Sequence, residues 1–201
     1  MSPAPTVLVI ASGNAGKVRE FGHLLADLDL EIRAQPEGFS VEENGSTFAA
    51  NARLKATAVA QATGHWALAD DSGLCVEALG GAPGVHSARY ADSDGARIQR
   101  LLDELEQAAI TTGTDNRRAD FVAALALADP SGTIQLEVEG HCPGTILTTP
   151  QGEGGFGYDP VFFVAEAGQT FAEMDRALKG QIGHRGRAFA LLQPQLEALF
   201  A

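Results

Sequence analysis

Lysine is scarce in this chain of 201 residues. Against eleven arginines there are only three lysines, Lys17, Lys55 and Lys179. Arginine therefore supplies most of the positively charged side chains. A compact ammonium with three donors is not replaceable by a planar guanidinium where it must fit between phosphate oxygens. Chance and codon usage explain the shortage unless the three lysines fall in functional motifs, so the sequence around each of them bears on function.

Positive charge, cysteine and long apolar runs are also in short supply. The formal net charge of −12 argues against a general nucleic-acid-binding protein, because such proteins present a basic face. Cys75 and Cys142 lack the spacing of a zinc site, which predicts buried free thiols and a reducing cytoplasm. No stretch approaches the roughly 20 apolar residues of a membrane span, and residues 6–11 lack the features of a signal peptide. We expect a cytoplasmic protein with neither a membrane nor a nucleic-acid partner.

The composition is that of an ordinary globular protein. Hydrophobic residues make up 45% of the chain and charged residues 20%. A chain of this length can bury a substantial core within one domain. With no internal repeat, low-complexity run or linker, residues 1–201 are predicted to form a single domain.

The first motif joins a strand to a helix. Residues 6–11 are an apolar, β-branched run typical of a buried strand, and apolar residues recur at helical spacing from Val18 to Leu28. The connecting loop, 12–17, offers backbone N–H groups and polar side chains to an anion at the helix start. It is not a Walker A loop, because Val18 stands where the metal-binding hydroxyl should be. A phosphate cradle and an ordinary strand-helix junction both fit this pattern.

The next two stretches supply carboxylates. After a short strand predicted at Glu31 to Ala34, the acidic loop 37–45 precedes a helix that Ser46 or Thr47 can cap. Asn51 and Lys55, four residues apart, lie on one face of that helix and can reach the same ligand. Glutamates in such a loop are more often solvated than ligating, but one of them could complete an all-oxygen Mg²⁺ shell.

An apolar strand ends at two adjacent carboxylates. The run from Trp66 to Ala69 is followed by Asp70 and Asp71, whose side chains point to opposite faces if strand geometry persists. One can therefore bind a metal while the other anchors the loop, although a surface hairpin with solvated carboxylates is the plainer alternative. Ser72-Gly73 is predicted to turn the chain, with a second short strand over residues 74–79.

The rest of the chain contains a further helix, a hairpin, a glycine-rich loop and two C-terminal helices. Ser93 is expected to cap the helix, and residues 119–128 and 133–139 are predicted to be strands joined by a tight turn. The loop 152–160 matches Gly-x-Gly-x-x-Gly but precedes a strand, so it fails as a dinucleotide fingerprint. Phe156 within it offers a flat face for stacking a base. Helices are expected over residues 170–182 and from about 183 onwards, with Pro194 kinking or restarting the second.

Five motifs lie in order along the chain: Ser12-Gly-Asn-x-x-Lys17, Phe48-x-x-Asn51-Ala-x-x-Lys55-Ala, Asp70-Asp-Ser-Gly73 continuing to Ser87-Ala-Arg-Tyr90, Gly155-Phe-Gly-Tyr-Asp-Pro160, and His184-Arg-Gly186. Together they resemble the motifs of the inosine triphosphate pyrophosphatase family, the HAM1-like proteins that act on noncanonical purine nucleoside triphosphates. All three lysines fall in or beside these motifs. Gly183 departs from the pattern, since many relatives have serine there, and the missing hydroxyl could loosen base recognition.

The resemblance implies an α/β fold with an elongated, mixed, twisted sheet flanked by helices and two lobes around a central cleft, usually in a homodimer. The implied reaction is Mg²⁺-assisted hydrolysis of ITP, dITP or XTP to the monophosphate and pyrophosphate. By the same resemblance, Asp71 is the proton acceptor and, with Glu43, a metal ligand. The implied substrate-binding residues are Ser12, Gly13, Asn14, Ala15, Gly16, Lys17, Lys55, Ser72, Phe156, Gly157, Tyr158, Asp159, Lys179, His184 and Arg185.

Two other functions are compatible with the sequence. A related pyrophosphatase of the Maf-like kind would prefer methylated or pyrimidine nucleotides to ITP. A nucleotide-binding regulator would hold a triphosphate without hydrolysing it, but the carboxylates Glu43, Asp70 and Asp71 argue against this, because a pure binder has little use for negative charge beside phosphates.

Overall fold

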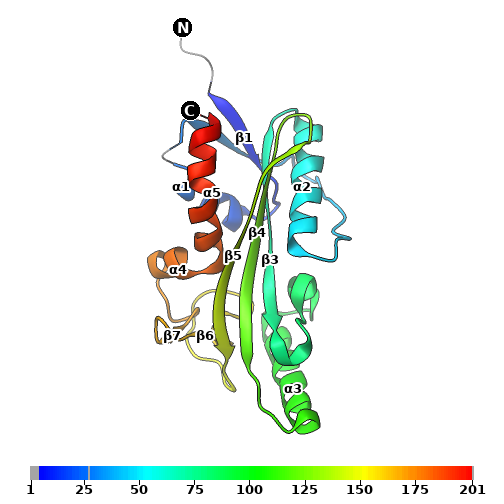
Figure 1. Ribbon diagram of the computed structural model, residues 1–201, viewed down its shortest axis with the longest axis vertical. Helices are drawn as coiled ribbons and strands as arrows, with labels where there is room; N and C mark the ends of the chain where they lie inside the picture. The colour runs from blue at the N-terminus through cyan, green and yellow to red at the C-terminus, as the bar shows by residue number, and fades with distance from the viewer. Residues whose placement is uncertain (1–4, 27, 201) are drawn as a thin grey trace. The chain divides into compact units, whose positions relative to one another are not determined.

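The structure is a computed structural model that describes residues 5–26 and 28–200 (Figure 1). The strands are β1 (Thr6–Ile10), β2 (Leu30–Ala34), β3 (Trp66–Val76), β4 (Arg118–Ala128), β5 (Ile134–Ile146), β6 (Phe162–Val164) and β7 (Gln169–Thr170). The helices are α1 (Ala15–Leu24), α2 (Phe48–Thr63), α3 (Asp94–Thr112), α4 (Arg176–Ile182) and α5 (His184–Phe200). Short 3-10 turns cover Glu77–Leu79, Gly84–Arg89 and Asp159–Val161.

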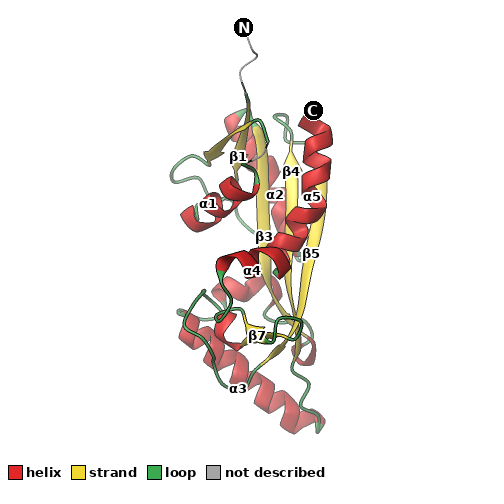
Figure 2. Cartoon of the chain, turned by 90° about the vertical axis from the view of Figure 1, so that its left-hand side faces the viewer, coloured by secondary structure: helices red, strands yellow, loops and turns green. Residues whose placement is uncertain are grey.

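The strands form one mixed sheet in the order β2-β1-β3-β4-β5-β6-β7. Strand β1 is parallel to β2, with Leu8 opposite Ile32, and parallel to β3, with Leu8 opposite Trp66. Strand β6 is antiparallel to both β5 and β7. Helices α2 and α5 run alongside the long strands in Figure 1 and Figure 2. The predicted α/β class with a mixed sheet flanked by helices is confirmed.

The chain folds into two compact units. The first unit contains the described residues up to Asp71, Ala124–Glu139 and the chain from Ala188 onwards. The second unit contains Ser72–Ala123 and Gly140–Arg187. A single domain with a cleft between two lobes stays a prediction.

Helices α1 and α2 and strand β1 form the framework of the first unit. Leu8 and Ile10 of β1 are 0% and 1% exposed, as expected for a central strand. The side chain of Thr47 accepts a hydrogen bond from the N–H of Ala50, so the predicted cap of α2 is confirmed. The face of α2 that packs against the core consists of small and branched residues, with Ala52 and Ala56 fully buried. This brings α2 close enough for its polar residues to reach strand β3.

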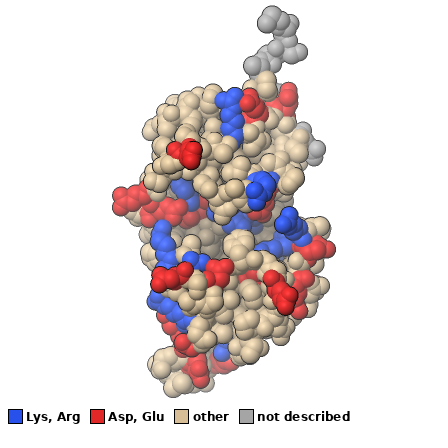
Figure 3. Space-filling view, turned by 180° about the vertical axis from the view of Figure 1, so that it is seen from behind, with Lys and Arg blue, Asp and Glu red and all other residues tan. Residues whose placement is uncertain are grey.

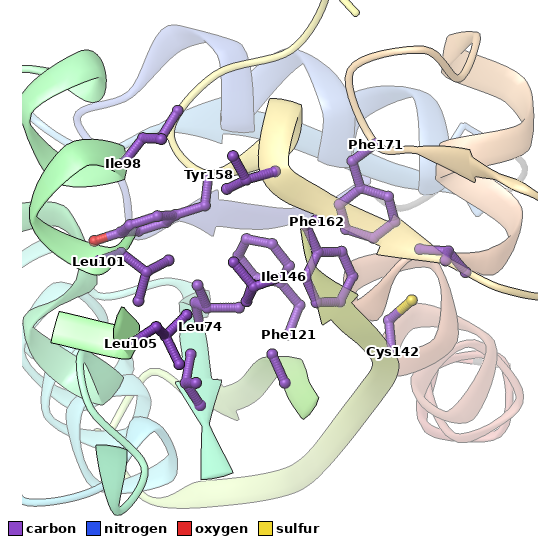
Figure 4. Packing of buried hydrophobic residues seen from close by; sticks show 14 residues of the cluster. Leu74, Ile98, Leu101, Leu105, Phe121, Cys142, Ile146, Tyr158, Phe162 and Phe171 are labelled. Carbon is purple, nitrogen blue, oxygen red and sulfur yellow. The ribbon is translucent and has the colours of Figure 1, made fainter. Parts of the chain in front are cut away.

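A second core lies under helix α3. Figure 4 shows its aromatic and aliphatic side chains, which include Phe121, Tyr158, Phe162 and Phe171. The ring centroids of Phe121 and Phe162 are 4.7 Å apart in an edge-to-face pair. Ser93 caps α3 as predicted, because its side chain accepts from the N–H of Ala96. Through Tyr158, this core holds one residue of the glycine-rich loop 152–160.

The predicted turn at Ser72-Gly73 is wrong. Strand β3 runs without interruption from Trp66 to Val76, and residues 77–79 form a 3-10 turn instead of the end of a second strand. Leu74 and Val76 are fully buried, so their hydrophobic burial keeps the strand extended past its polar segment. Asp70 and Asp71 therefore lie within the strand, not at its end.

Three other boundaries differ from the sequence-based prediction. Helix α4 begins only at Arg176, because Asp175 caps it by accepting from the N–H of Leu178, whereas a helix was expected from residue 170. Strand β5 extends to Ile146 instead of ending at residue 139. Helix α5 continues through Pro194 to Phe200, so the proline does not restart the helix, while the alternative, a kink at Pro194, stays a prediction.

Neither cysteine forms a disulfide, as predicted, but the prediction of a buried thiol is confirmed for Cys142 and wrong for Cys75. Cys142 is fully buried, and this burial raises the pKa of its thiol to about 11, whereas Cys75 is half-buried. At pH 8 roughly one Cys142 thiol in a thousand is ionised, and only the thiolate is nucleophilic. We therefore expect iodoacetamide to label Cys75 well before Cys142, as mass spectrometry of digests would show. Equal labelling rates in the folded protein would contradict this.

Across the described residues, no helix combines the length and the apolar character that crossing a membrane requires. On the face shown in Figure 3, acidic and basic side chains are interspersed. The net charge of −12 therefore does not produce a face of one sign on that side.

Candidate functional site

Three charged residues meet in the first unit. The Lys55 ammonium donates to Glu43 Oε1 at 2.8 Å and to Asp71 Oδ1 at 3.0 Å. Glu43 comes from the acidic loop, Lys55 from α2 and Asp71 from β3. The side chains of Lys55 and Asp71 are only 13% and 12% exposed, so this contact is largely withdrawn from water. Two carboxylates thus converge on one cation.

Asn51 connects this cluster to the acidic loop. Its side chain is fully buried, donates from Nδ2 to Asp71 Oδ2 at 3.1 Å and accepts at Oδ1 from the N–H of Gly45 at 2.8 Å. A Cβ atom at Gly45 would lie 2.6 Å from that oxygen, so only glycine permits the approach. Asn51 and Lys55 both bond to the carboxylate of Asp71, so they point to one side of α2 as predicted. That they reach the same ligand stays a prediction.

Burial and charge act on the two central groups in different ways. Burial raises the pKa of Asp71 above its ordinary value, and the hydrogen bonds from Lys55 and Asn51 only partly oppose it. Burial alone would lower the pKa of Lys55, but the attraction of Asp71 and Glu43 outweighs it and raises that pKa. Lys55 therefore stays a cation, while Asp71 has a stronger affinity for protons than an exposed aspartate.

We expect the Asp71 carboxyl in the metal-free protein to titrate above 3.8, the ordinary value for aspartate. Because the folded-state pKa is raised, the contribution of this group to stability is present below pH 3.8 and is lost as the pH rises through the folded-state pKa. Replacing Asn51 with alanine should raise the pKa further by removing a donor. Carbon-13 NMR of the side-chain carboxyl measures both values, and a titration at or below 3.8 would contradict the assignment.

Asp70 lies next to Asp71 in β3 but has a different partner. Its Oδ2 atom is 2.5 Å from the ammonium of Lys17, and the Asp70 side chain is only 2% exposed. Adjacent strand residues point to opposite faces, which separates this pair from Lys55 and Asp71. The two aspartates thus have different lysine partners, and Asp70 holds Lys17. The predicted division into a metal ligand and a loop anchor stays a prediction.

The loop before α1 differs in one respect from the prediction. The Asn14 side chain accepts from the N–H groups of Gly16 at 2.8 Å and Lys17 at 3.3 Å, and so caps the helix itself. The N–H of Asn14 donates to Ser12 Oγ at 3.1 Å. The backbone N–H groups of Gly16 and Lys17 that were expected to be open to an anion are therefore engaged. Gly13 and Ala15 are exposed beside them.

The carboxylates of Glu43 and Asp71 are suitable ligands for a hard divalent cation, but they supply only part of its coordination shell. Among the described residues, no three His, Cys, Asp or Glu side chains are grouped so that they could hold a metal ion by themselves. However, two carboxylate oxygens lie within 3.0 Å of one ammonium, so they already share a single positive charge. One or two carboxylates completed by water and ligand oxygens are typical of Mg²⁺ sites in proteins.

A second cluster lies in the second unit around the glycine-rich loop. Asp159, which is 3% exposed, accepts at Oδ2 from the Lys179 ammonium at 2.5 Å and from the N–H of Phe156 at 2.9 Å. The Lys179 nitrogen is 5.2 Å from the ring centroid of Phe156 and 5.0 Å from that of Phe171. Phe156 itself is 62% exposed. An open aromatic face thus lies beside a fixed cation.

His184 and Arg185 are held at the start of α5, as predicted. The His184 ring stacks on Phe121, with centroids 4.8 Å apart and planes 15° apart. The Arg185 guanidinium donates to Ser72 Oγ at 2.8 Å. Gly183 precedes them, and a Cβ atom there would lie 2.5 Å from the carbonyl oxygen of Lys179. A serine at this position would therefore require the local backbone to shift.

Some functional candidates were not predicted as site residues. Asn51 had a signal, its spacing of four from Lys55, but was not assigned to the site. Phe121 had none, because an aromatic residue in an apolar strand is usually only a core residue. Tyr158, in contrast, was assigned to the substrate, but its side chain is 4% exposed and its hydroxyl donates to the Ser87 carbonyl at 2.9 Å. Its side chain therefore serves the core.

Fold and side-chain chemistry together define an α/β protein with buried lysine-carboxylate clusters on both of its units. The sequence profile of the Ham1 family matches residues 8–195. This chain belongs to the Ham1 family.

Curated relatives resemble the chain over nearly its whole length. A protein from Parasynechococcus marenigrum named dITP/XTP pyrophosphatase is 62% identical over 96% of each chain. One of the same name from Nostoc sp. is 53% identical over 97% of this chain and 96% of its own. Among solved structures, a HAM1 protein from Coxiella burnetii has a TM-score of 0.90 and 41% identity, covering 96% of this chain and 99% of that one.

Proposed function

We propose that this protein is a nucleoside triphosphate pyrophosphatase that hydrolyses dITP, XTP and ITP to the monophosphate and pyrophosphate. The observation that carries the proposal is the full-length similarity to proteins named dITP/XTP pyrophosphatase, with 62% identity to one of them. The cluster of Asp71, Lys55 and Glu43 supports it, because a buried carboxylate beside lysine suits water activation next to a phosphate.

Asp71 is the residue that we assign to the attacking water. The attack breaks the bond between the α phosphorus and the oxygen that bridges it to the β phosphorus, so the pyrophosphate leaves with that oxygen. The proton of the water goes to the Asp71 carboxylate, whose raised pKa makes it a better acceptor than an exposed aspartate. Asn51 and Lys55 hold the carboxylate in one orientation through their bonds to its two oxygens.

Glu43 and Asp71 are the residues that would hold Mg²⁺. When bound, this ion would polarise a phosphoryl oxygen and offset the charge of the triphosphate. Lys17 and Lys55 add two ammonium groups to the same unit, each already fixed by a carboxylate. An acidic protein can hold a triphosphate when such groups neutralise it locally. Ser12, Gly13, Asn14, Ala15 and Gly16 complete the proposed phosphate-binding loop.

The second cluster is proposed to bind the purine base. N–H donors are available from Lys179, His184 and Arg185. Hypoxanthine and xanthine present an acceptor oxygen at position 6, where adenine has an amino group that donates. Donors aimed at that position reject adenine, because buried donors would be left unpaired. Ser72, which accepts a hydrogen bond from Arg185, belongs to the same proposed site, as do residues 156–159, with Tyr158 contributing its backbone and not its buried side chain.

Phe156→Ala is expected to raise KM for XTP by roughly 5- to 150-fold, the range that corresponds to about 1–3 kcal/mol for stacking of one base. The ring is largely exposed, so its removal should leave the fold intact. Steady-state kinetics with the matched variant Ile110→Ala, which loses another exposed apolar side chain in the same unit, provides the comparison. An unchanged KM in Phe156→Ala would refute the stacking role.

A substrate panel tests the proposed function. Values of kcat/KM for dITP, XTP, ITP, ATP, GTP and a methylated pyrimidine triphosphate are compared under the same conditions. We expect the first three to exceed ATP and GTP. A preference for the methylated pyrimidine nucleotide would indicate a Maf-like activity instead, and tight binding without turnover would indicate a regulator.

We also propose a homodimer in the cytoplasm. The resemblance to the family supports the dimer, and light scattering coupled to gel filtration tests it. Two cysteines outside disulfides and a nucleotide substrate suit a reducing compartment. Fractionation of the native host tests the location.

A further inference from the structure

The exposed ring of Phe156 lies on a turn that has little stiffness of its own. Gly155 and Gly157, on either side of it, both have positive φ angles, of 76° and 62°. Glycine has the largest backbone freedom of any residue, and that freedom is lost when the turn is fixed. A ligand that stacks on Phe156 would have to supply this ordering unless the protein already does. The contacts that hold the turn therefore affect how well the ring can bind.

Two of these contacts come from residues on the C-terminal side of the ring. The N–H of Phe156 donates to Asp159, and the Tyr158 hydroxyl donates to the Ser87 carbonyl at 2.9 Å. In Figure 4 the ring of Tyr158 lies near Ile98 and Leu101 of α3. Both residues are buried, at 4% for Tyr158 and 3% for Asp159. They anchor the end of the turn but leave Gly157, between Phe156 and Tyr158, to a third contact.

That third contact comes from Asp94, the first residue of α3. Its Oδ2 atom accepts from the N–H of Gly157 at 2.7 Å, while Oδ1 accepts from the Arg97 guanidinium at 2.6 Å. Helix α3 is itself fixed, because Ile98, Leu101 and Leu105 are packed in the core. The Asp94 side chain is 47% exposed, so it has no part in that core. Asp94 and Gly157 are 63 residues apart in the sequence.

We propose that Asp94 is a positioning residue, which fixes the Gly157 peptide on helix α3 and so presents the Phe156 ring to the base of the substrate. The inference rests on the proposed function and adds to it a residue outside the motifs that suggested that function. Asp94 acts through Phe156 and does not itself touch the substrate. Its loss should therefore weaken substrate binding and leave the chemical step almost unchanged.

Amide hydrogen exchange tests the contact itself, without any substrate. Asp94→Ala should speed exchange at the Gly157 N–H, measured by NMR, whereas Asp94→Asn should not. The single amide oxygen of asparagine can still accept from Gly157, because the partly exposed Arg97 guanidinium retains its bond to the Ala91 carbonyl and can turn to water. Asp103→Ala is the matched control, since Asp103 is an aspartate on the same helix whose side chain accepts a hydrogen bond from Gln99 of that helix. Unchanged exchange in Asp94→Ala would overturn the proposal, whatever the activity of the protein.

Kinetics with XTP then tests the consequence. Asp94→Ala should raise KM by about fivefold, the effect of one hydrogen bond to a half-exposed charged group, with kcat within about twofold of the wild type. Asp94→Asn and Asp103→Ala should match the wild type. In a Phe156→Ala background, Asp94→Ala should have no further effect on KM, because the ring that it positions is gone.

Three kinetic results would overturn the proposal: a fall in kcat with KM unchanged, an equal effect of Asp94→Asn and Asp94→Ala, or additive effects of Asp94→Ala and Phe156→Ala. Failure of the proposed function has a different signature. In that case the wild-type protein releases no pyrophosphate from XTP, and XTP cannot shift the Phe156 and Gly157 resonances of the metal-free protein. The role of Asp94 toward a base would then be rejected with it, even if the exchange result confirmed the contact.

Discussion

Asp71→Asn is expected to lower kcat with XTP by about 10²- to 10⁴-fold, the range typical of a lost general base. The amide cannot take the proton of the attacking water, although it has nearly the same shape as the carboxyl. At saturating Mg²⁺, KM should change much less, because no phosphate-binding donor is removed. Stopped-time assays of pyrophosphate release measure both constants.

The structure also predicts a moderate loss of stability in Asp71→Asn. Two donors, Asn51 Nδ2 and the Lys55 ammonium, point at the two carboxylate oxygens, and an amide has only one oxygen to accept from them. One buried donor is left facing an NH₂ group, which costs about 1–3 kcal/mol. The protein should remain folded, as circular dichroism would show. Glu42→Gln, a change of charge at an exposed position beside Glu43, should affect neither activity nor stability. Near-normal turnover in a folded Asp71→Asn protein would remove Asp71 from the catalytic role.

Lys55→Met should have the second-largest effect, on both stability and activity. It leaves the carboxylates of Glu43 and Asp71 facing each other without the cation that they share. Removing one partner of a buried ion pair costs about 3–5 kcal/mol, and the partial exposure of Glu43 lowers this to about 2–4 kcal/mol at neutral pH. Loss of a cation beside the proposed triphosphate should also lower kcat/KM by at least about thirtyfold.

The pH dependence separates this explanation from a simple packing defect. Because the pKa of Asp71 is raised, this carboxyl takes up its proton at a higher pH than an ordinary aspartate and then needs no counter-ion. The stability difference between Lys55→Met and the wild type should therefore shrink as the pH is lowered through the pKa of Asp71. Urea unfolding at several pH values measures it, and a constant difference would contradict the electrostatic origin.

Arg53→Met is the matched control on the same helix. Arg53 contacts Glu137 at 2.7 Å, but its side chain is 45% exposed. An exposed ion pair contributes about 0–1 kcal/mol, so this variant should be nearly as stable as the wild type. It should also retain full activity, because Arg53 is no part of the proposed site. A loss of stability and activity as large as that of Lys55→Met would contradict a specific role of Lys55.

Much of the fold could be predicted from local patterns. The apolar run over residues 6–11 and the candidate caps, Ser46 or Thr47 for α2 and Ser93 for α3, are local signals. Strand β1 covers Thr6–Ile10 of that run, and Thr47 and Ser93 cap the two helices. The prediction of a turn at Ser72-Gly73 is wrong, because a short polar segment within a strand has the same local composition as a turn. Burial of Leu74 and Val76 against residues far away in the chain keeps that segment extended.

The contacts among the predicted site residues could not be predicted from the sequence, and the roles of these residues stay predictions. The motifs named Lys17, Lys55 and the two aspartates, yet nothing in them pairs Lys17 with Asp70 and Lys55 with Asp71. Those pairings depend on which face of β3 each helix covers. The bond from Gly157 to Asp94 is a second case, since contacts between segments 63 residues apart leave no local signature.

Product analysis of XTP hydrolysis tests the central claim most directly. The purified protein is incubated with XTP in Mg²⁺ and, separately, in excess EDTA, and the products are separated by anion-exchange chromatography. We predict equal amounts of xanthosine monophosphate and pyrophosphate in Mg²⁺ and no turnover in EDTA. Release of orthophosphate with xanthosine diphosphate would contradict cleavage between the α and β phosphates, and no turnover in either condition would contradict the proposed enzyme.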